Sequence, residues 1–174
     1  MKNYAVIRTD RMFGTDNRAG LVSVLIPDEY NDSPLEHLEN GSIVILNGLV
    51  EGERELYAIE QPTASSMIHP NMAIIATPEL LYDERLRNLD DFTNEAGKAA
   101  RAYRLHHGDI FSLTAEGLDV GDATDPIAVG WAVNPTAGWK LAVEDDSADP
   151  GEAMGRVIAV DNTGRYTYYV IQID

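Results

Sequence analysis

The chain has 174 residues, a net charge of −16 from 29 acidic and 13 basic side chains, and no cysteine. This length fits one large domain or two small ones, and a hydrophobic content of 44% excludes disorder of the whole chain. The composition excludes disulfides, thiolate metal sites and thiol nucleophiles, and the acidity disfavours nucleic acid and anionic membranes as partners. Ala5–Ile7 is too short an apolar run for a signal peptide, and no stretch approaches the roughly 20 apolar residues of a spanning helix, so we expect neither.

In the first half of the chain, short apolar runs bounded by turn residues predict strands. These runs are Tyr4–Ile7, Leu21–Ile26, Ile43–Leu46, Glu55–Glu60 and Met72–Ala76. Gly41–Gln61 is the clearest hairpin signal, because two of the runs flank turn-forming residues at 51–53. Arg11–Gly20 and Asp28–Asn40 are expected to be loops, the second with one helical turn at Ser33–Leu38.

The middle of the chain holds one ambiguous segment, two further strands and a loop. Leu80–Glu95 has apolar residues at helical spacing but many poor helix formers, so a short helix and an extended surface segment both stay open. Lys98–Thr114 is predicted to form two strands around a turn at His106–Asp109. Glu116–Asp125, rich in glycine and acids, is the candidate boundary between two β regions.

Four short runs in the last third again predict strands separated by turns. They are Ile127–Val133, Trp139–Val143, Gly155–Val160 and Tyr166–Ile173. The last two are expected to pair as a hairpin, because Asn162 and Gly164 between them tolerate positive φ. The acidic stretch Glu144–Glu152 is expected to be a surface loop.

This pattern predicts a mainly β fold: a sandwich or barrel built of short antiparallel strands, with long loops and at most one or two short helices. The candidate boundary divides the chain into an N-terminal β region with extended loops, residues 1–115, and a C-terminal β subdomain, residues 116–174. One continuous domain over residues 1–174 is the alternative.

Two groups of potential metal ligands stand in predicted turns and loops. His106 and His107 are adjacent, but neighbouring residues on a strand point to opposite faces, and no third ligand follows at a regular spacing. Asp145, Asp146 and Asp149 form an acidic stretch that lacks the glycine and glutamate positions of an EF-hand. We therefore expect a polar turn and a solvated loop, with no metal site at either.

Catalytic motifs are missing as well. The neighbouring carboxylates are Glu53/Glu55, Asp83/Glu84 and Asp90/Asp91. Acid–base catalysis needs one carboxyl held in an apolar pocket, and with 29 acids some adjacency is inevitable. Neither a nucleophile elbow nor a phosphate-binding loop occurs. The sequence thus predicts no enzyme, no catalytic residue and no cofactor; a hydrolase using an unobvious acid pair is an alternative.

The aromatic residues of the C-terminal region have two interpretations. Trp131 and Trp139 flank a predicted turn, and the favoured interpretation is that they anchor a local core across a hairpin. The other is that they stack on a ligand or seal an interface, where tryptophan is enriched. The same question applies to Tyr166 and Tyr168, which share one strand face, and to Tyr169 on the other.

Four segments carry a resemblance: YAVIRTDRMFGT from Tyr4, LENGSIVILNGLVEGERELYAI from Leu38, KAARAYRLHHGDIFSLT from Lys98 and GRYTYYVIQI from Gly164. They resemble small bacteriophage capsid-associated proteins encoded beside the major head protein. The later half, with VGWAVNPTAGWKLAVEDD from Val129, is similar to the β-rich decoration, or cement, proteins that coat phage heads.

The resemblance implies a β fold with no cofactor and no catalytic residues, bound to the outside of a capsid. It implies the major capsid protein as partner, a homo-oligomer with a trimer favoured, and a place on the virion exterior after synthesis in the host cytoplasm. We therefore expect a virion structural protein that stabilises a phage head by decorating it. A β-sandwich carbohydrate-binding module using Trp131 and Trp139 is the alternative.

Overall fold

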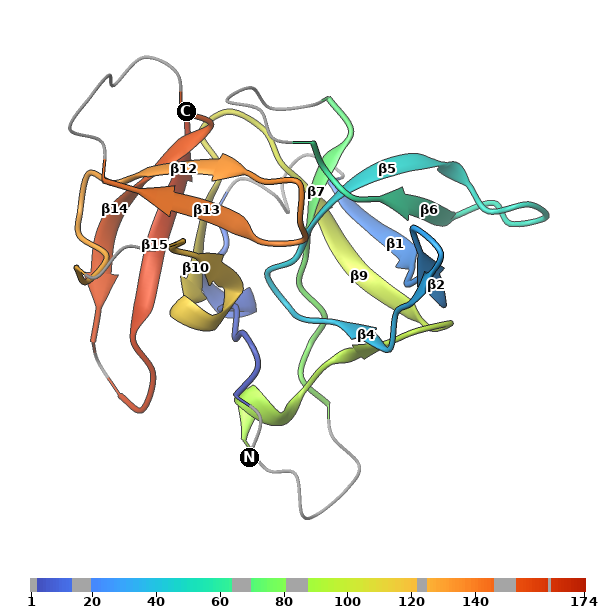
Figure 1. The fold of residues 1–174 in the computed structure, drawn as a ribbon, viewed down its shortest axis with the longest axis horizontal. Helices are drawn as coiled ribbons and strands as arrows, with labels where there is room; N and C mark the ends of the chain where they lie inside the picture. Colours follow the sequence, from blue (N-terminus) through green and yellow to red (C-terminus); the bar gives the residue numbers. More distant parts are fainter. Residues whose placement is uncertain are drawn as a thin grey trace.

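The computed structural model describes residues 3–13, 20–63, 70–80, 88–121, 125–145, 153–162 and 164–174. Over these residues the protein is mainly β, as predicted, with a closed barrel beside a six-stranded sheet (Figure 1). Its described helices are three-residue 3-10 turns at Thr9–Arg11, Leu89–Asp91 and Ala115–Gly117. None of them is long enough to cross a membrane.

Five strands close the barrel. They are β1 (Leu21–Leu25), β5 (Ile43–Leu49), β6 (Leu56–Glu60), β7 (Met72–Ile75) and β9 (Ala99–Arg104). The order around the barrel is β1-β6-β5-β7-β9, and β9 returns to pair with β1. Antiparallel pairing of β5 with β6 confirms the predicted hairpin in Gly41–Gln61.

The other sheet takes most of its strands from the C-terminal part of the chain. In spatial order they are β10 (Ile110–Thr114), β15 (Tyr168–Ile173), β14 (Gly155–Asp161), β12 (Ala132–Pro135), β13 (Leu141–Glu144) and β11 (Leu118–Asp119). The predicted terminal hairpin is confirmed by the antiparallel pairing of β14 with β15. Two of the described strand pairs, β1 with β6 and β11 with β13, are parallel, so the expected antiparallel arrangement does not hold throughout.

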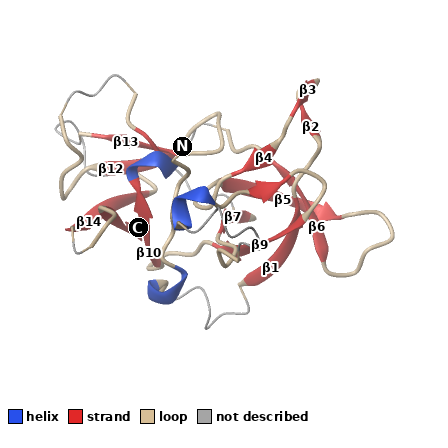
Figure 2. Cartoon of the chain, turned by 90° about the horizontal axis from the view of Figure 1, so that it is seen from below, coloured by secondary structure: helices blue, strands red, loops and turns tan. Residues whose placement is uncertain are grey.

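Two small sheets correct the expectation of a loop with a helical turn in Asp28–Asn40. β2 (Glu29–Tyr30) pairs with β3 (Ser33–Pro34), and β4 (His37–Leu38) pairs with β8 (Asn94–Glu95). Asn31 and Asp32 between β2 and β3 have φ of 51° and 59°. Positive φ at both central residues is the geometry of a tight two-residue hairpin turn, which asparagine and aspartate tolerate well. The hairpin projects from the barrel (Figure 2).

Three further expectations about strands need correction. β9 and β10 exist, but they belong to different sheets, so His106–Asp109 connects the barrel to the six-stranded sheet and is not a hairpin turn. Tyr4–Ile7 forms one isolated bridge, Ile7 to Leu113, in place of a strand. The strand expected at Ile127–Val133 begins only at Ala132.

Other expectations fall partly on residues outside the described ranges. Residues 81–87 of the ambiguous segment Leu80–Glu95 lie outside them, and the described remainder contains the 3-10 turn at Leu89–Asp91 followed by β8. Residues 14–19 of the expected loop Arg11–Gly20 also lie outside, as do residues 146–152 of the expected acidic loop.

The barrel and the sheet share a core. Along β7, Ala73 and Ile75 point into the barrel, whereas Met72 and Ile74 pack with apolar residues of the six-stranded sheet. All four are buried, because both faces of this strand are covered. The cores therefore meet through the wall of the barrel that β7 forms.

The boundary expected between residues 115 and 116 falls inside the six-stranded sheet. β10, on its N-terminal side, pairs along its whole length with β15 on the C-terminal side. The N-terminal segment also joins this sheet, through bridges of Ile7 and Phe13 to β10. Strand pairing thus does not follow the boundary, and the number of independent folding units stays a prediction.

Candidate functional site

The histidine pair lies between the two sheets. His106 Nδ1 is 3.5 Å from a carboxylate oxygen of buried Asp109, and the same oxygen accepts a hydrogen bond from the His106 backbone N–H at 2.8 Å. His107 is exposed. Among the described residues no cluster of three histidine or acidic side chains is arranged to hold a metal ion. The two histidines thus lie in the polar segment that connects β9 to β10, where Asp109 accepts a hydrogen bond from the His106 backbone N–H.

The acidic candidates do not converge. Asp145 is exposed, and Asp146 and Asp149 lie outside the described residues, as do Asp83 and Glu84. Glu53 and Glu55 are both exposed at the turn before β6.

Asp90 and Asp91 have structural partners. Asp90 accepts a hydrogen bond from the Tyr166 hydroxyl at 2.7 Å, whereas Asp91 accepts one from the Asn88 backbone N–H at 3.2 Å. The Asp91 contact caps the 3-10 turn at Leu89–Asp91.

The two tryptophans lie in different cores and do not face each other across one hairpin. Trp131 is 7% exposed and packs in the core shared by barrel and sheet. Trp139 is half-buried, packs against the barrel interior and meets Tyr30 edge-on, with ring centroids 5.1 Å apart. The core interpretation holds for Trp131, but the pair forms no common exposed surface on which a sugar ring would stack.

Tyr166 and Tyr168 line a small cavity of about 260 Å³ together with charged side chains. Its arginines already have partners: Arg8 bonds to both carboxylate oxygens of Asp10, at 3.1 and 2.7 Å, and Arg165 lies 3.5 Å from Asp90. The guanidinium of Arg8 holds the pKa of Asp10 below its usual value, chiefly through this hydrogen bonding. These charges compensate one another, so the cavity has little charge to offer a ligand.

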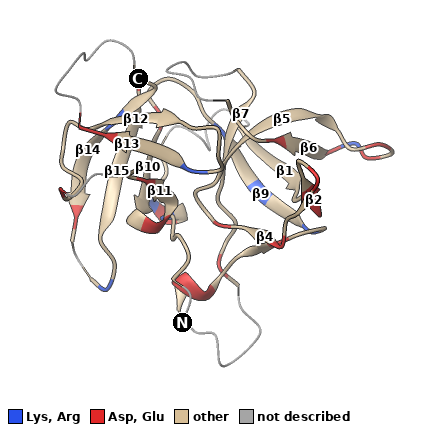
Figure 3. Ribbon diagram, in the orientation of Figure 1, with Lys and Arg blue, Asp and Glu red and all other residues tan. Residues whose placement is uncertain are grey.

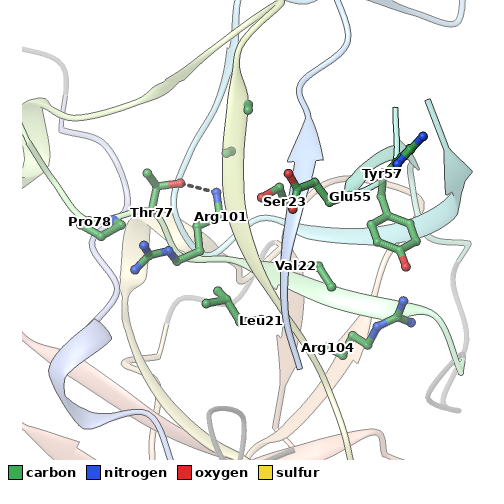
Figure 4. Close-up of a pocket in the computed structure, with 12 residues that line it drawn as sticks. Leu21, Val22, Ser23, Glu55, Tyr57, Thr77, Pro78, Arg101 and Arg104 are labelled. Atoms are coloured by element: carbon green, nitrogen blue, oxygen red, sulfur yellow. Dashed lines mark hydrogen bonds between the residues drawn. The ribbon is translucent and has the colours of Figure 1, made fainter. Parts of the chain in front are cut away.

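A larger and more open groove, of about 780 Å³, crosses the barrel over β1 (Figure 4). It forms where the barrel seam is short. β1 pairs with β6 over only two residues, Ser23 and Val24, whereas its pairing with β9 covers the whole strand. Two apolar residues of β1 line the groove: Leu21, which is 50% exposed, and Val22.

Three arginines and one glutamate line this groove, which we call the arginine groove. Arg54 and Glu55 come from the turn before β6, and Arg101 and Arg104 come from β9. In Figure 4, Leu21 and Val22 lie between the two β9 arginines. Arg104 lies over the Tyr57 ring, with its guanidinium carbon 5.3 Å from the centroid, so its position is supported from within the groove.

Among the described cations, the arginines of the groove differ from most others because they form no ion pair. Of the nine lysines and arginines that the structure describes, five form ion pairs with carboxylates. The four that do not are Arg54, Lys98, Arg101 and Arg104. Three of these line the groove, and Lys98 directly precedes β9. Figure 3 shows basic positions on β9 and in the turn before β6. Within the described ranges, unpaired positive charge is therefore concentrated at one place, on a chain of net charge −16.

Sequence reasoning did not single out this site. Arg54 and Arg101 are 47 positions apart and share no local motif. One signal was present: the alternation Ala100-Arg101-Ala102 places alanines inside a strand-built core and the arginine outside it, as the structure has them. The alternation does not show that β9 pairs with β1, and this pairing forms the site.

The arginine groove has the composition of a binding surface. Its combination of accessible apolar side chains with three arginines matches the enrichment of arginine seen at protein–protein interfaces. No family model matches the chain, and no curated protein matches it.

Proposed function

We propose that this chain is a virion structural protein that binds the outer surface of a phage capsid and stabilises the head, acting by binding and not by catalysis. The arginine groove is the observation that supports this proposal most directly. It combines an exposed apolar side chain, Leu21, with guanidinium groups that form no ion pair within the described chain. Such a surface gains most when a partner covers the apolar part and pairs the charges.

The shape of the protein also suits a role in docking. The β5–β6 hairpin extends away from the barrel (Figure 1). The β2–β3 hairpin also projects from the barrel (Figure 2). Projecting hairpins add contact area at the junctions between capsid subunits, and area buried against a shell is what a cement protein contributes. The resemblance of four segments to capsid-associated proteins points to the same role.

The proposal is tested on purified phage particles from cells that express the chain. We expect mass spectrometry to find the protein in the particles, and cryo-electron microscopy to place it on the outside of the head. Absence of the protein from particles made in such cells would contradict the proposal.

Stabilisation is tested separately by adding the purified protein to undecorated heads. We expect the heads to melt at a higher temperature, because a ligand that binds only the intact shell stabilises it by mass action. Charge reversal in the groove, Arg101→Glu, should abolish the increase. The matched control is Arg11→Glu, which changes the net charge equally at a 60% exposed side chain outside the groove and should retain it.

A further inference from the structure

We infer that the arginine groove binds an extended, acidic segment of the partner protein. Carboxylates of that segment pair with Arg54, Arg101 and Arg104, and its apolar side chains cover Leu21 and Val22. The inference rests on the proposed docking function, and adds the chemistry of what the groove recognises.

Charge carries the first part of the argument. The groove holds three arginines against one glutamate, on a protein whose other described cations are mostly paired. A guanidinium presents a planar fork of donors that matches a carboxylate, and partial burial strengthens the pair. An acidic segment would therefore be attracted to this surface and repelled by most of the remainder.

Shape carries the second part. The groove is open, its volume is about 780 Å³, and its lining extends from the turn before β6 across β1 and β9, which suits a chain segment better than a compact ligand. Arg101 and Arg104 are three residues apart on a strand, a rise of about 10 Å. Side chains three residues apart on a strand leave opposite faces, so the two guanidinium groups flank Leu21 and Val22 from either side (Figure 4). An extended segment that crosses between them can bring a carboxylate to each arginine while its apolar side chains cover Leu21 and Val22.

Other occupants fit less well. A second copy of this chain would bring a further sixteen net negative charges, whereas a short segment brings only a few. A nucleic acid would need aromatic platforms for its bases, and the one aromatic residue lining the groove, Tyr57, is covered by Arg104.

The test uses a fluorescent peptide of about twelve residues that repeats Glu-Val-Leu, with a Lys-Val-Leu peptide as control and fluorescence anisotropy as readout. We expect the full-length protein to bind the glutamate peptide, to bind the lysine peptide at least about tenfold more weakly, and to lose affinity as salt rises. Arg101→Glu should weaken binding of the glutamate peptide about tenfold, because an attraction is replaced by a repulsion of similar size. Arg11→Glu should bind as the wild type does, and circular dichroism establishes that both variants are folded.

Several results would overturn the inference. These are equal affinity for the two peptides, unchanged affinity in Arg101→Glu, tighter binding of an anionic oligosaccharide or single-stranded DNA than of the glutamate peptide, and self-association on ultracentrifugation that Arg101→Glu abolishes. Failure here is distinguishable from failure of the proposed function. Particles that contain the protein, without any peptide binding, would refute only the acidic segment; arginine-dependent peptide binding by a protein absent from particles would refute only the virion role.

Discussion

At the residue scale, Asp90 links three separate parts of the chain. Its backbone carbonyl accepts a hydrogen bond from the Tyr4 N–H at 3.0 Å, and its carboxylate accepts one from the Tyr166 hydroxyl at 2.7 Å. The Arg165 guanidinium lies 3.5 Å from the same carboxylate and also contacts Asn88. Asp90, one member of an adjacent acidic pair in the sequence, is thus a structural junction.

The variant Tyr166→Phe should lower the free energy of unfolding by about 1–3 kcal/mol, because it removes a hydrogen bond to a buried carboxylate. Tyr169→Phe is the matched control: its ring packs against the shared core, its hydroxyl has no hydrogen bond to the described residues, and a much smaller effect is expected. Urea unfolding of the three proteins measures the difference. Equal losses in the two variants would show that the Asp90 contact contributes little.

The same tyrosine gives a prediction for alkaline pH. Burial, and then the hydrogen bond to Asp90, raise the pKa of Tyr166 above its ordinary value of 10.0. The folded state therefore holds the phenolic proton more tightly, and this contribution to stability is lost as pH rises from 10.0 through the raised pKa. The wild type should lose more stability than Tyr166→Phe between pH 8 and about pH 11, as followed by urea unfolding.

A substitution at Glu79 is expected to stabilise the protein at neutral pH, whereas Tyr166→Phe is expected to destabilise it. Burial raises the pKa of its carboxyl, and a hydrogen bond from Asn40 Nδ2 at 3.2 Å offsets this only in part. The ionised form is disfavoured in the folded state, so stability falls as pH rises from 4.5 through the raised pKa. Glu79→Gln keeps an acceptor for Asn40 and should melt at a higher temperature than the wild type at pH 7. The difference should close below about pH 4, where both side chains are neutral; a difference independent of pH would contradict this account.

At the element scale, β7 is the strand on which both cores depend. Ile74 and Ile75 are fully buried on opposite faces, one in the shared core and the other inside the barrel. Truncation of either to alanine should cost about 2–5 kcal/mol through lost burial and a cavity. Ile158→Ala on β14, where the side chain is 37% exposed, should cost far less. Thermal unfolding compares the three, and a small loss at Ile74 would mean that barrel and sheet are packed only loosely.

The sequence predicts elements whose partners are close along the chain better than elements whose partners are distant. The β5–β6 hairpin and the β14–β15 hairpin are local, and apolar runs around turn residues were enough to predict them. β9 and β10 were predicted as strands but assigned to each other, because chain proximity favours a hairpin and their true partners are distant. The turn at Asn31 and Asp32 was missed although its residues tolerate positive φ, because the strands on either side are only two residues long.

The arginine groove could not be predicted for the same reason. Its lining comes from β6 and the turn before it, from β1, from the residues after β7 and from β9. Long-range closure of the barrel brings these segments together, and a strand pattern shows which side chains point outward but not which strands are neighbours. The expected absence of metal and catalytic residues says nothing about where a binding surface lies.

At the scale of the whole molecule, Gly41, just before β5 of the barrel, closely approaches β10 of the six-stranded sheet. Gly41 has a φ of 87°, and a Cβ placed there would overlap the Leu113 side chain on β10. Gly48 also has positive φ, 75°, but no atom lies within 4 Å of its added Cβ. Both alanine variants carry the same backbone strain, so Gly41→Ala should be the less stable by the cost of overpacking, about 1–3 kcal/mol. Equal melting temperatures would show that Leu113 moves aside freely.

The shared core implies that barrel and sheet unfold together. Leu113 of β10 and Ile74 of β7 belong to one apolar cluster, and β10 depends on β15 for its strand pairing. A fragment of residues 1–115 keeps the barrel strands but exposes the outer face of β7 and leaves β10 unpaired, so we expect it not to fold alone. The full chain should show one calorimetric transition whose enthalpy equals the van't Hoff value. Dispersed NMR signals from the fragment, or two separate transitions in the full chain, would instead mark the barrel as an independent unit, and the six-stranded sheet would then be an addition to it and not part of one core.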